Sequence, residues 1–181
     1  GNALPPDGND FIQVGGGRLY SAALRYDGSL EVWGYDAFGQ VSRKPAGNNF
    51  TEVHVGMYHV VARKSDGTLV GWGQYELGGD VADSIPTGND YRMVECGSGK
   101  LWCTLNADTG IECYGPNGDG HPTDTGYISL VVGNKMAYAL KANGFVAGWG
   151  DNRHNQIDHL NSDANTRMSR DPWFEPPNWA I

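Results

Sequence analysis

Short apolar runs separated by glycine-containing turns recur four times along the chain of 181 residues. The four copies begin at an aromatic residue, at Phe11, Phe50, Tyr91 and Tyr127. Within each copy the apolar runs are short, rich in Val, Leu and aromatic side chains, bounded by glycine, and without a helical period. This pattern predicts at least three antiparallel strands per copy and no substantial helix.

A turn separates the second predicted strand from the third in every copy. The turns are Asp27-Gly28, Asp66-Gly67, Thr109-Gly110 and Asn143-Gly144. Asp-Gly and Asn-Gly between apolar runs favour type I′ hairpins, in which both central residues take a positive φ. Three or four antiparallel strands repeated at about 40 residues have the spacing of a propeller blade. We therefore predict an all-β propeller of four repeats over residues 11–157, closed as a four-bladed ring or left as a partial ring that another chain completes.

The third predicted strand of each copy ends on an aromatic residue followed by glycine. These pairs are Trp33-Gly34, Trp72-Gly73, Tyr114-Gly115 and Trp149-Gly150. A large ring that recurs at one position of a repeat is typical of packing between neighbouring sheets. We predict that Trp33, Trp72, Tyr114 and Trp149 belong to the structural core and are not ligand-stacking groups.

These residues resemble the repeat of the regulator-of-chromosome-condensation family of β-propellers. In the first copy the matching positions are Val14, Gly17, Ala23-Leu24, Asp27-Gly28, Trp33-Gly34 and Gly39-Gln40. The fourth copy matches as well, and its last matching residue is Gln156. The second copy has Gly78-Gly79 in place of Gly-Gln, and the third has Tyr114 in place of Trp. The short repeat is similar to that of bacterial members such as the β-lactamase inhibitory protein of this fold. The resemblance implies a propeller; the family's rings usually have seven blades, and four units depart from that number.

Composition limits the classes of partner. The chain carries 21 acidic and 13 basic residues, for a net charge of −8, which disfavours nucleic acid because phosphate binding needs clustered Lys and Arg. The acidic surface favours solubility, or alternatively a basic partner. No apolar run approaches the ~20 residues of a membrane helix, so we expect no membrane insertion. No secretion signal stands at Gly1, so we expect a processed start, a tag remnant or a chain that is not exported.

All three cysteines lie in the third copy, at Cys96, Cys103 and Cys113. If the turn is centred on Asp108, Cys103 and Cys113 face each other across a hairpin, close enough for a disulfide. Two small buried thiols are the alternative. A disulfide would indicate an oxidising compartment.

We find no pattern that predicts a metal, a cofactor or catalysis. No pair of cysteines or histidines completes a zinc set, and Gly15-Gly16-Gly17 precedes a strand, so it does not place a helix N-terminus on a phosphate. His59 stands beside the second strand and is expected to be structural. His154 and His159 with Asp151 and Asp158 could form a weak surface metal site, which we do not favour.

The segments outside the repeat and the loops after each aromatic-glycine pair carry the candidate contacts. We divide the chain into an N-terminal arm (1–10), the repeats (11–157) and an aromatic, proline-rich tail (158–181) that completes a blade or docks on a partner. The loops differ from copy to copy on a constant frame, as in binding faces. The candidate binding residues are Tyr35, Phe38, Tyr75, Leu77, Trp173, Phe174 and Trp179.

The pattern favours a non-enzymatic protein-binding or assembly module, whose partner is another protein or a second copy. One version is a structural subunit of a virion, a tail or an extracellular assembly; another is a secreted inhibitor. A carbohydrate-binding or carbohydrate-processing propeller is the alternative, which would need a carboxylate pair and exposed Trp on one face. We expect an extracellular or virion-associated location.

Overall fold

The computed structural model describes residues 4–74, 79–99, 101–115 and 118–157. These residues form twelve strands and one short 3₁₀ helix, η1 (Val81–Ser84). The strands make four antiparallel sheets of three, each in chain order, which we name blades 1 to 4. Blade 1 contains β1 (Phe11–Gly16), β2 (Tyr20–Arg25) and β3 (Leu30–Gly34); blade 2 contains β4 (Phe50–Val55), β5 (His59–Lys64) and β6 (Leu69–Gly73). Blade 3 contains β7 (Tyr91–Cys96), β8 (Trp102–Asn106) and β9 (Ile111–Tyr114); blade 4 contains β10 (Tyr127–Val132), β11 (Met136–Lys141) and β12 (Val146–Gly150).

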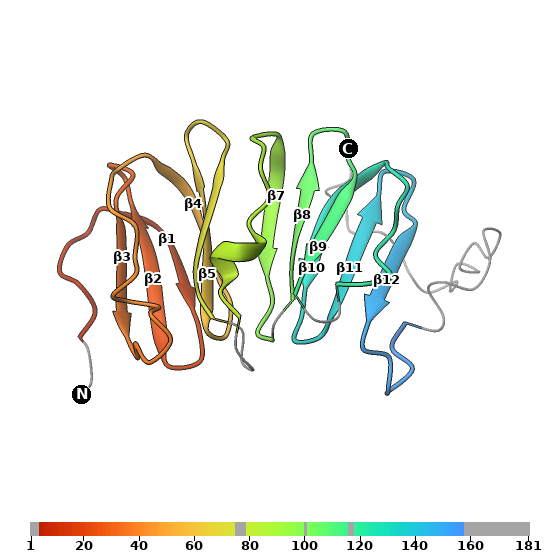
Figure 1. The fold of residues 1–181 in the computed structure, drawn as a ribbon. Helices are drawn as coiled ribbons and strands as arrows, with labels where there is room; N and C mark the ends of the chain where they lie inside the picture. The colour runs from red at the N-terminus through yellow and green to blue at the C-terminus, as the bar shows by residue number, and fades with distance from the viewer. Residues whose placement is uncertain (1–3, 75–78, 100, 116–117, 158–181) are drawn as a thin grey trace, which may run out of the picture.

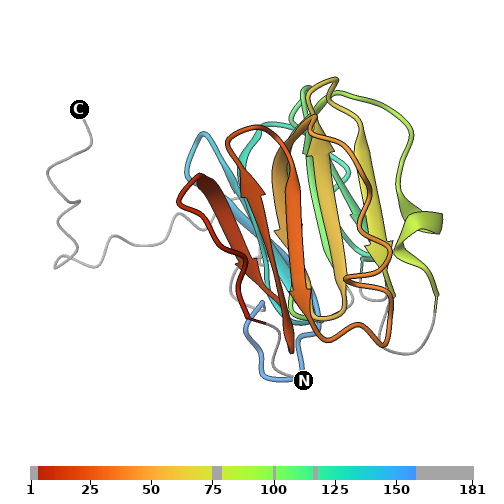
Figure 2. The same cartoon turned by 90° about the vertical axis from the view of Figure 1, so that its left-hand side faces the viewer.

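The blades stand side by side in chain order, and each packs against the next (Figure 1). Figure 2 views them from the blade 1 end and shows the later blades curving round instead of lying straight behind it. Blades 1 and 4 are therefore the two ends of an arc. The prediction of an all-β, four-bladed propeller-like fold is confirmed, and over the described residues the arc is open between blade 4 and blade 1.

Apolar side chains that alternate along the strands bury both faces of the inner blades. Between blades 1 and 2 the core includes Leu24, Leu30, Phe50, Val53 and Val60. Between blades 2 and 3 it includes Val61, Leu69, Tyr91, Val94 and Trp102. Between blades 3 and 4 it includes Cys103, Leu105, Tyr127, Leu130 and Trp149. Successive residues of a strand point to opposite faces, so β5 uses Val60 toward blade 1 and Val61 toward blade 3.

The hairpin turns differ from the predicted type I′. In blade 1 only Gly28 of the turn has a positive φ, of 81°, and its N–H donates to the carbonyl of Arg25 at 3.0 Å. The Asp27 carboxylate accepts from the backbone N–H of Ser29 at 2.9 Å. This is a longer turn that ends in a left-handed glycine, and the Asp side chain closes it by bonding two residues ahead. In blade 3 Thr109 takes the left-handed position with a φ of 67°.

The recurring aromatic residues are buried to different extents. Trp72 and Trp149 are 2% and 3% exposed, and Trp72 donates its indole N–H to the carbonyl of Gln40 at 2.8 Å. Tyr114 is half-buried and stacks on the fully buried Trp102 with ring centroids 4.3 Å apart. Trp33 is only half-buried, because no blade among the described residues packs on that face of blade 1.

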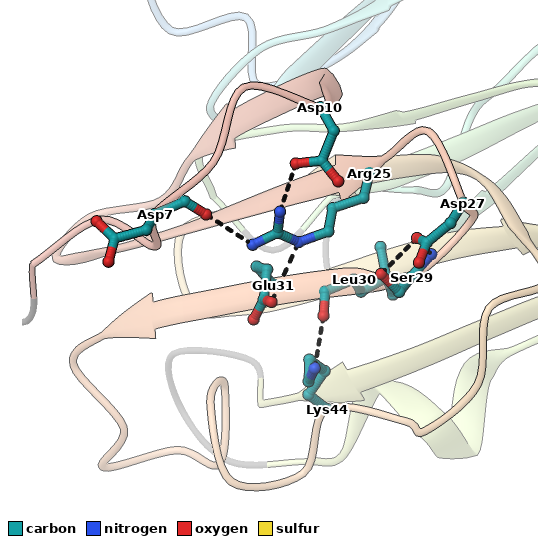
Figure 3. Close-up of polar contacts among 8 residues, drawn as sticks. All are labelled: Asp7, Asp10, Arg25, Asp27, Ser29, Leu30, Glu31 and Lys44. Atoms are coloured by element: carbon teal, nitrogen blue, oxygen red, sulfur yellow. Dashed lines mark hydrogen bonds and ion pairs between the residues drawn. The ribbon is translucent and has the colours of Figure 1, made fainter.

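The segment before β1 is fixed to blade 1 by Arg25 (Figure 3). The Arg25 guanidinium donates to the Asp7 carbonyl at 3.0 Å, pairs with the carboxylates of Asp10 and Glu31, and lies 4.3 Å from the centroid of the Phe11 ring. Blade 4 repeats the device: Lys141 pairs with Asp124 and lies 4.8 Å from the centroid of the Tyr127 ring. In blades 1 and 4, a cation at the end of the second strand therefore fixes the aromatic residue that opens the blade.

Candidate binding face

The loops that follow the third strands meet the turns between the first and second strands at one rim of the arc. The backbone N–H of Tyr35 donates to Leu19 at 2.9 Å, that of Gln74 to Tyr58 at 3.1 Å, and that of Asp151 to Lys135 at 2.8 Å. We call this edge the loop rim; it comprises residues 17–19, 35–40, 56–58, 74, 133–135 and 151–157. The hairpin turns, 26–29 in blade 1 and their counterparts, form the opposite edge, the turn rim.

An aromatic group spans blades 1 and 2 at the loop rim. The rings of Tyr35 and Phe38 meet edge to face with centroids 6.1 Å apart, and those of Phe38 and Tyr58 with centroids 4.8 Å apart. Arg18 lies over the Tyr58 ring at 5.9 Å and donates to its hydroxyl. Tyr35 is 41% exposed, whereas Tyr58 is buried. We call Arg18, Tyr35, Phe38 and Tyr58 the rim group.

Hydrogen bonds hold the loop that carries Tyr35 and Phe38 in a fixed shape. Asp36 accepts from the backbone N–H groups of Val41 and Ser42 at 2.7 and 2.9 Å, and the Gln40 side chain accepts from Phe38 at 3.0 Å. Burial raises the pKa of Asp36, but the bonds from Ser42 and Val41 outweigh it and leave the pKa below its usual value. Since the Gln40 carbonyl also binds Trp72 of blade 2, the loop is organised before any partner arrives.

Charged side chains lie together where blade 2 meets blade 3. Arg63 pairs with Glu52 and donates to the Tyr91 carbonyl at 3.0 Å, and the His54 ring nitrogen lies 3.5 Å from the other oxygen of Glu52. Burial raises the pKa of Glu52, but the bonds to His54 and Arg63 bring it below its usual value. Burial, together with the charge of Glu52, raises the pKa of Glu95. Glu52 is thus held by two partners of its own blade, and the bond from Arg63 to the Tyr91 carbonyl ties blade 2 to blade 3.

A shallow pocket lies on blade 2 between β6 and η1. It is lined by Thr68–Gly71, Ala82 and Ile85–Gly88, which supply apolar groups, threonine hydroxyls and backbone. Such a lining offers no carboxylate pair for glycoside hydrolysis.

The sulfur-containing and metal-ligating side chains have the following positions. Cys103 and Cys113 are directly opposite each other on β8 and β9, with Cα atoms 4.1 Å apart, and they form a disulfide; Cys96 is a free thiol. Burial, and less so the charge of Glu95, raises the pKa of the Cys96 thiol above its usual value. No group of three or more His, Cys, Asp or Glu suited to a metal ion occurs among the residues described. Within the same residues no helix has the length and apolarity needed to span a membrane.

The structure brings together two of the predicted binding residues, Tyr35 and Phe38. Tyr75, Leu77, Trp173, Phe174 and Trp179 lie outside the described residues, as does His159. Sequence reasoning missed Arg18 and Tyr58, which lie 40 residues apart along the chain. An alignment of the repeats gives one signal for Tyr58. It places this aromatic residue where the first copy has Leu19, in the turn that follows the repeated glycine.

The chain resembles solved propeller-like structures. No protein-family model matches it, and no curated protein sequence does. The ectodomain of the receptor kinase CR4 from Physcomitrella patens superposes with a TM-score of 0.66 at 24% identity, over 77% of this chain and 39% of that one. The CRINKLY WD40 ectodomain of the receptor kinase ACR4 from Arabidopsis thaliana gives 0.65 at 21%, over 77% and 50%. Prp20p from Saccharomyces cerevisiae, the yeast RCC1, gives 0.63 at 18%, over 81% and 47%.

These likenesses show that the chain shares the fold of the regulator-of-chromosome-condensation propeller. The chain spans between 39% and half of the length of the three structures. The finer resemblance to the bacterial β-lactamase inhibitory protein stays a prediction.

Proposed function

We propose that this chain is a non-enzymatic protein-binding module that engages its partner through the rim group. The observation that carries the proposal is the edge-to-face row of Tyr35, Phe38 and Tyr58 with Arg18 beside it, at the exposed edge of a rigid sheet frame. Aromatic and Arg side chains are enriched in protein interfaces and supply much of their binding energy.

The fixed shape of the loop supports binding because a partner would not have to order it. Side-chain ordering costs about 0.5–1.5 kcal/mol per immobilised residue on association, and the bonds of Asp36 and Gln40 meet that cost during folding. What is known of two proteins with the same fold agrees with a role in protein binding. One is a receptor kinase ectodomain, and Prp20p was crystallised bound to Kap60 and tested for binding to Gsp1p and histones.

The disulfide supports an extracellular or virion-associated location, because disulfides persist mainly in oxidising compartments. In that setting we favour a structural subunit of a virion, tail or extracellular assembly over a secreted inhibitor. We favour protein binding over carbohydrate processing, because the lining of the shallow pocket beside η1 carries no pair of acidic side chains.

The test places a photo-crosslinking amino acid at Tyr35 and, as a matched control, at Tyr26. Tyr26 is 83% exposed at the turn rim of the same blade, so both probes meet the same proteins in solution. The two variants are irradiated with the secreted and surface fractions of the source organism, and adducts are identified by mass spectrometry. We expect one protein adduct at position 35, reduced at least tenfold by Arg18→Ala and absent at position 26.

Equal labelling at both positions, or no adduct at position 35, would contradict a specific site at the loop rim. Binding of the chain to a glycan array with no protein adduct would favour the carbohydrate alternative. Loss of the adduct in Arg18→Ala without a change in the circular dichroism spectrum separates loss of contact from loss of fold.

A further inference from the structure

The first strand of blade 1 exposes a side chain whose counterparts are buried in every other blade. Val14 is 71% exposed, whereas Val53, Val94 and Leu130, at the same position of the repeat, are 1–2% exposed. Those three pack against the preceding blade, whereas none of the blades described packs on that face of blade 1. Leu19 shows the same contrast, because it is exposed where its counterpart Tyr58 is buried against Phe38.

The outer face of blade 4 shows the converse. Leu140 is 36% exposed, whereas Leu24 and Leu105 at the same position are fully buried against the following blade. The neighbouring positions agree. Met136, Tyr138 and Val146 are half-buried, whereas their counterparts in blades 1 to 3 are all buried. The two ends of the arc therefore carry the two halves of one blade-to-blade junction.

The hydrogen-bonding groups of that junction are also present at the ends. In the junction of blades 1 and 2 the Gln40 carbonyl accepts the indole N–H of Trp72. The loop after blade 4 is built in the same way: the Gln156 side chain accepts from the N–H of His154 at 3.0 Å, as Gln40 does from Phe38. Gln156 therefore occupies the acceptor's place at one end, and Trp33, the counterpart of Trp72, occupies the donor's place at the other.

We propose that a second copy of this chain completes the arc, so that blade 4 of each copy packs on blade 1 of the other and two chains form one ring of eight blades. A second copy fits because it brings to each end the half of the junction that the end lacks. Head-to-tail contacts give a ring where the rotation closes and a filament where it does not. Because the arc is curved (Figure 2), we expect two such contacts to close into a ring. The inference is independent of the proposed function, which uses the rim group between blades 1 and 2 and not the end faces of the arc.

One residue pair fixes the register of the proposed contact. Between blades 1 and 2, a Cβ built on Gly15 lies 3.1 Å from the Cβ of Val55. The repeat places Val131 at the position of Gly15 and Gly16 at the position of Val55. The small and large residues are thus exchanged at the ends of the arc. Val131 is 61% exposed, and a side chain added to Gly16 meets no atom within 4 Å.

The first measurement is the molar mass of the whole chain by light scattering over a range of concentrations. We expect a species of twice the 19.6 kDa chain. Val14→Asp should raise the dissociation constant of the dimer at least tenfold, because the substitution places a charge in the junction. The matched control is Ile12→Asp, two residues away on the same strand. Ile12 and its counterparts Thr51, Arg92 and Ile128 are exposed in every blade, so this charge should leave the mass unchanged.

The second measurement tests the register. Gly16→Cys and Val131→Cys chains are mixed in equal amounts and mildly oxidised; the disulfide needs Cβ atoms about 3.5–4.5 Å apart. We expect a covalent dimer that contains one chain of each kind, and little dimer from either variant alone. The proposal would be overturned by a monomer at all concentrations, by a filament, or by an equal loss of dimer in Ile12→Asp. Covalent dimers formed from one cysteine variant alone would also overturn it.

Discussion

The indole N–H of Trp72 donates to the backbone carbonyl of Gln40 at 2.8 Å, which links the core of blade 2 to the loop that leaves blade 1. Both groups are buried, so neither has water as a substitute partner. The bond therefore joins the repeated tryptophan of blade 2 to the Gly39-Gln40 loop of the preceding blade. The aromatic ring fills the space between blades, and its one polar atom meets the carbonyl that the glutamine loop presents.

Trp72→Phe should therefore cost more stability than Trp149→Phe. Both rings are buried, but no hydrogen-bond partner of the Trp149 indole is found among the described residues. Only the change at Trp72 leaves a buried carbonyl unpaired, which costs about 1–3 kcal/mol. We expect urea unfolding to give a free energy of unfolding lower by about that amount for Trp72→Phe than for Trp149→Phe. Equal losses would mean that the bond contributes nothing.

Full truncation checks the packing itself. Trp72→Ala and Trp149→Ala should each lower the free energy of unfolding by about 3–5 kcal/mol, as for other buried aromatic side chains. Tyr26→Ala, at a residue that is 83% exposed, is the control and should stay within about 0.5 kcal/mol of the parent. A comparable change at Tyr26 would show that the assay is not reporting burial.

Gly28→Ala should destabilise the chain more than Gly120→Ala. Both glycines have a positive φ, of 81° and 83°, so each change carries the strain of a left-handed alanine, about 1–2 kcal/mol. At Gly28 the new Cβ would also lie 2.3 Å from the carbonyl oxygen of Asn48, whereas at Gly120 it meets nothing within 4 Å. Thermal unfolding should show a lower midpoint for Gly28→Ala, and identical midpoints would refute the steric argument.

The disulfide should stabilise the third blade by constraining the unfolded chain. Closing a loop of about ten residues contributes roughly 2–3 kcal/mol in the chain-entropy estimate. We expect the paired change Cys103→Ala and Cys113→Ala to reduce the free energy of unfolding by that amount. Cys96→Ala, at the half-buried free thiol, is the control for loss of a cysteine side chain that is not cross-linked. If the two proteins lose the same stability, the cross-link adds nothing beyond packing.

The strands were predictable because aromatic residues, glycines and apolar runs keep one register through four copies. The turn type was not, because it depends on the Asp27 carboxylate closing on Ser29, a bond that competes with the two-residue hairpin. The half-exposed Trp33 was also missed. The position of Trp33 in the repeat predicts burial. Burial at that position needs another blade packed on the outer face of blade 1, and the sequence around Trp33 does not show whether such a blade is present.

The candidate site was predictable only in part, for a related reason. Tyr35 and Phe38 stood out as aromatic residues in a variable loop, whereas Arg18 and Tyr58 sit in short turns that look like ordinary connections. Their contact joins residues of two blades that lie 40 residues apart, so the sequence around either residue does not indicate it. Once the contacts of one pair of blades are known, an alignment of the repeats gives the residues at the same positions in the other blades.

His59 should make the stability of the chain depend on pH between about 4 and 6.5. Burial lowers the pKa of this side chain to about 4, from about 6.5 in the unfolded chain. Above pH 6.5 the ring is neutral in both states. As pH falls below 6.5 only the unfolded state takes up the proton, so the free energy of unfolding falls until the folded state also protonates near pH 4, by about 3 kcal/mol in total.

The matched variant is His59→Leu, since Leu101 occupies the same position in blade 3. Carboxylates with lowered pKa values, such as Asp36, also lose stability as pH falls, but they are common to both proteins. Urea unfolding measured from pH 4 to pH 7 should therefore show a steeper fall for the parent than for the variant. Parallel curves would mean that His59 is protonated in the folded chain as readily as in the unfolded one.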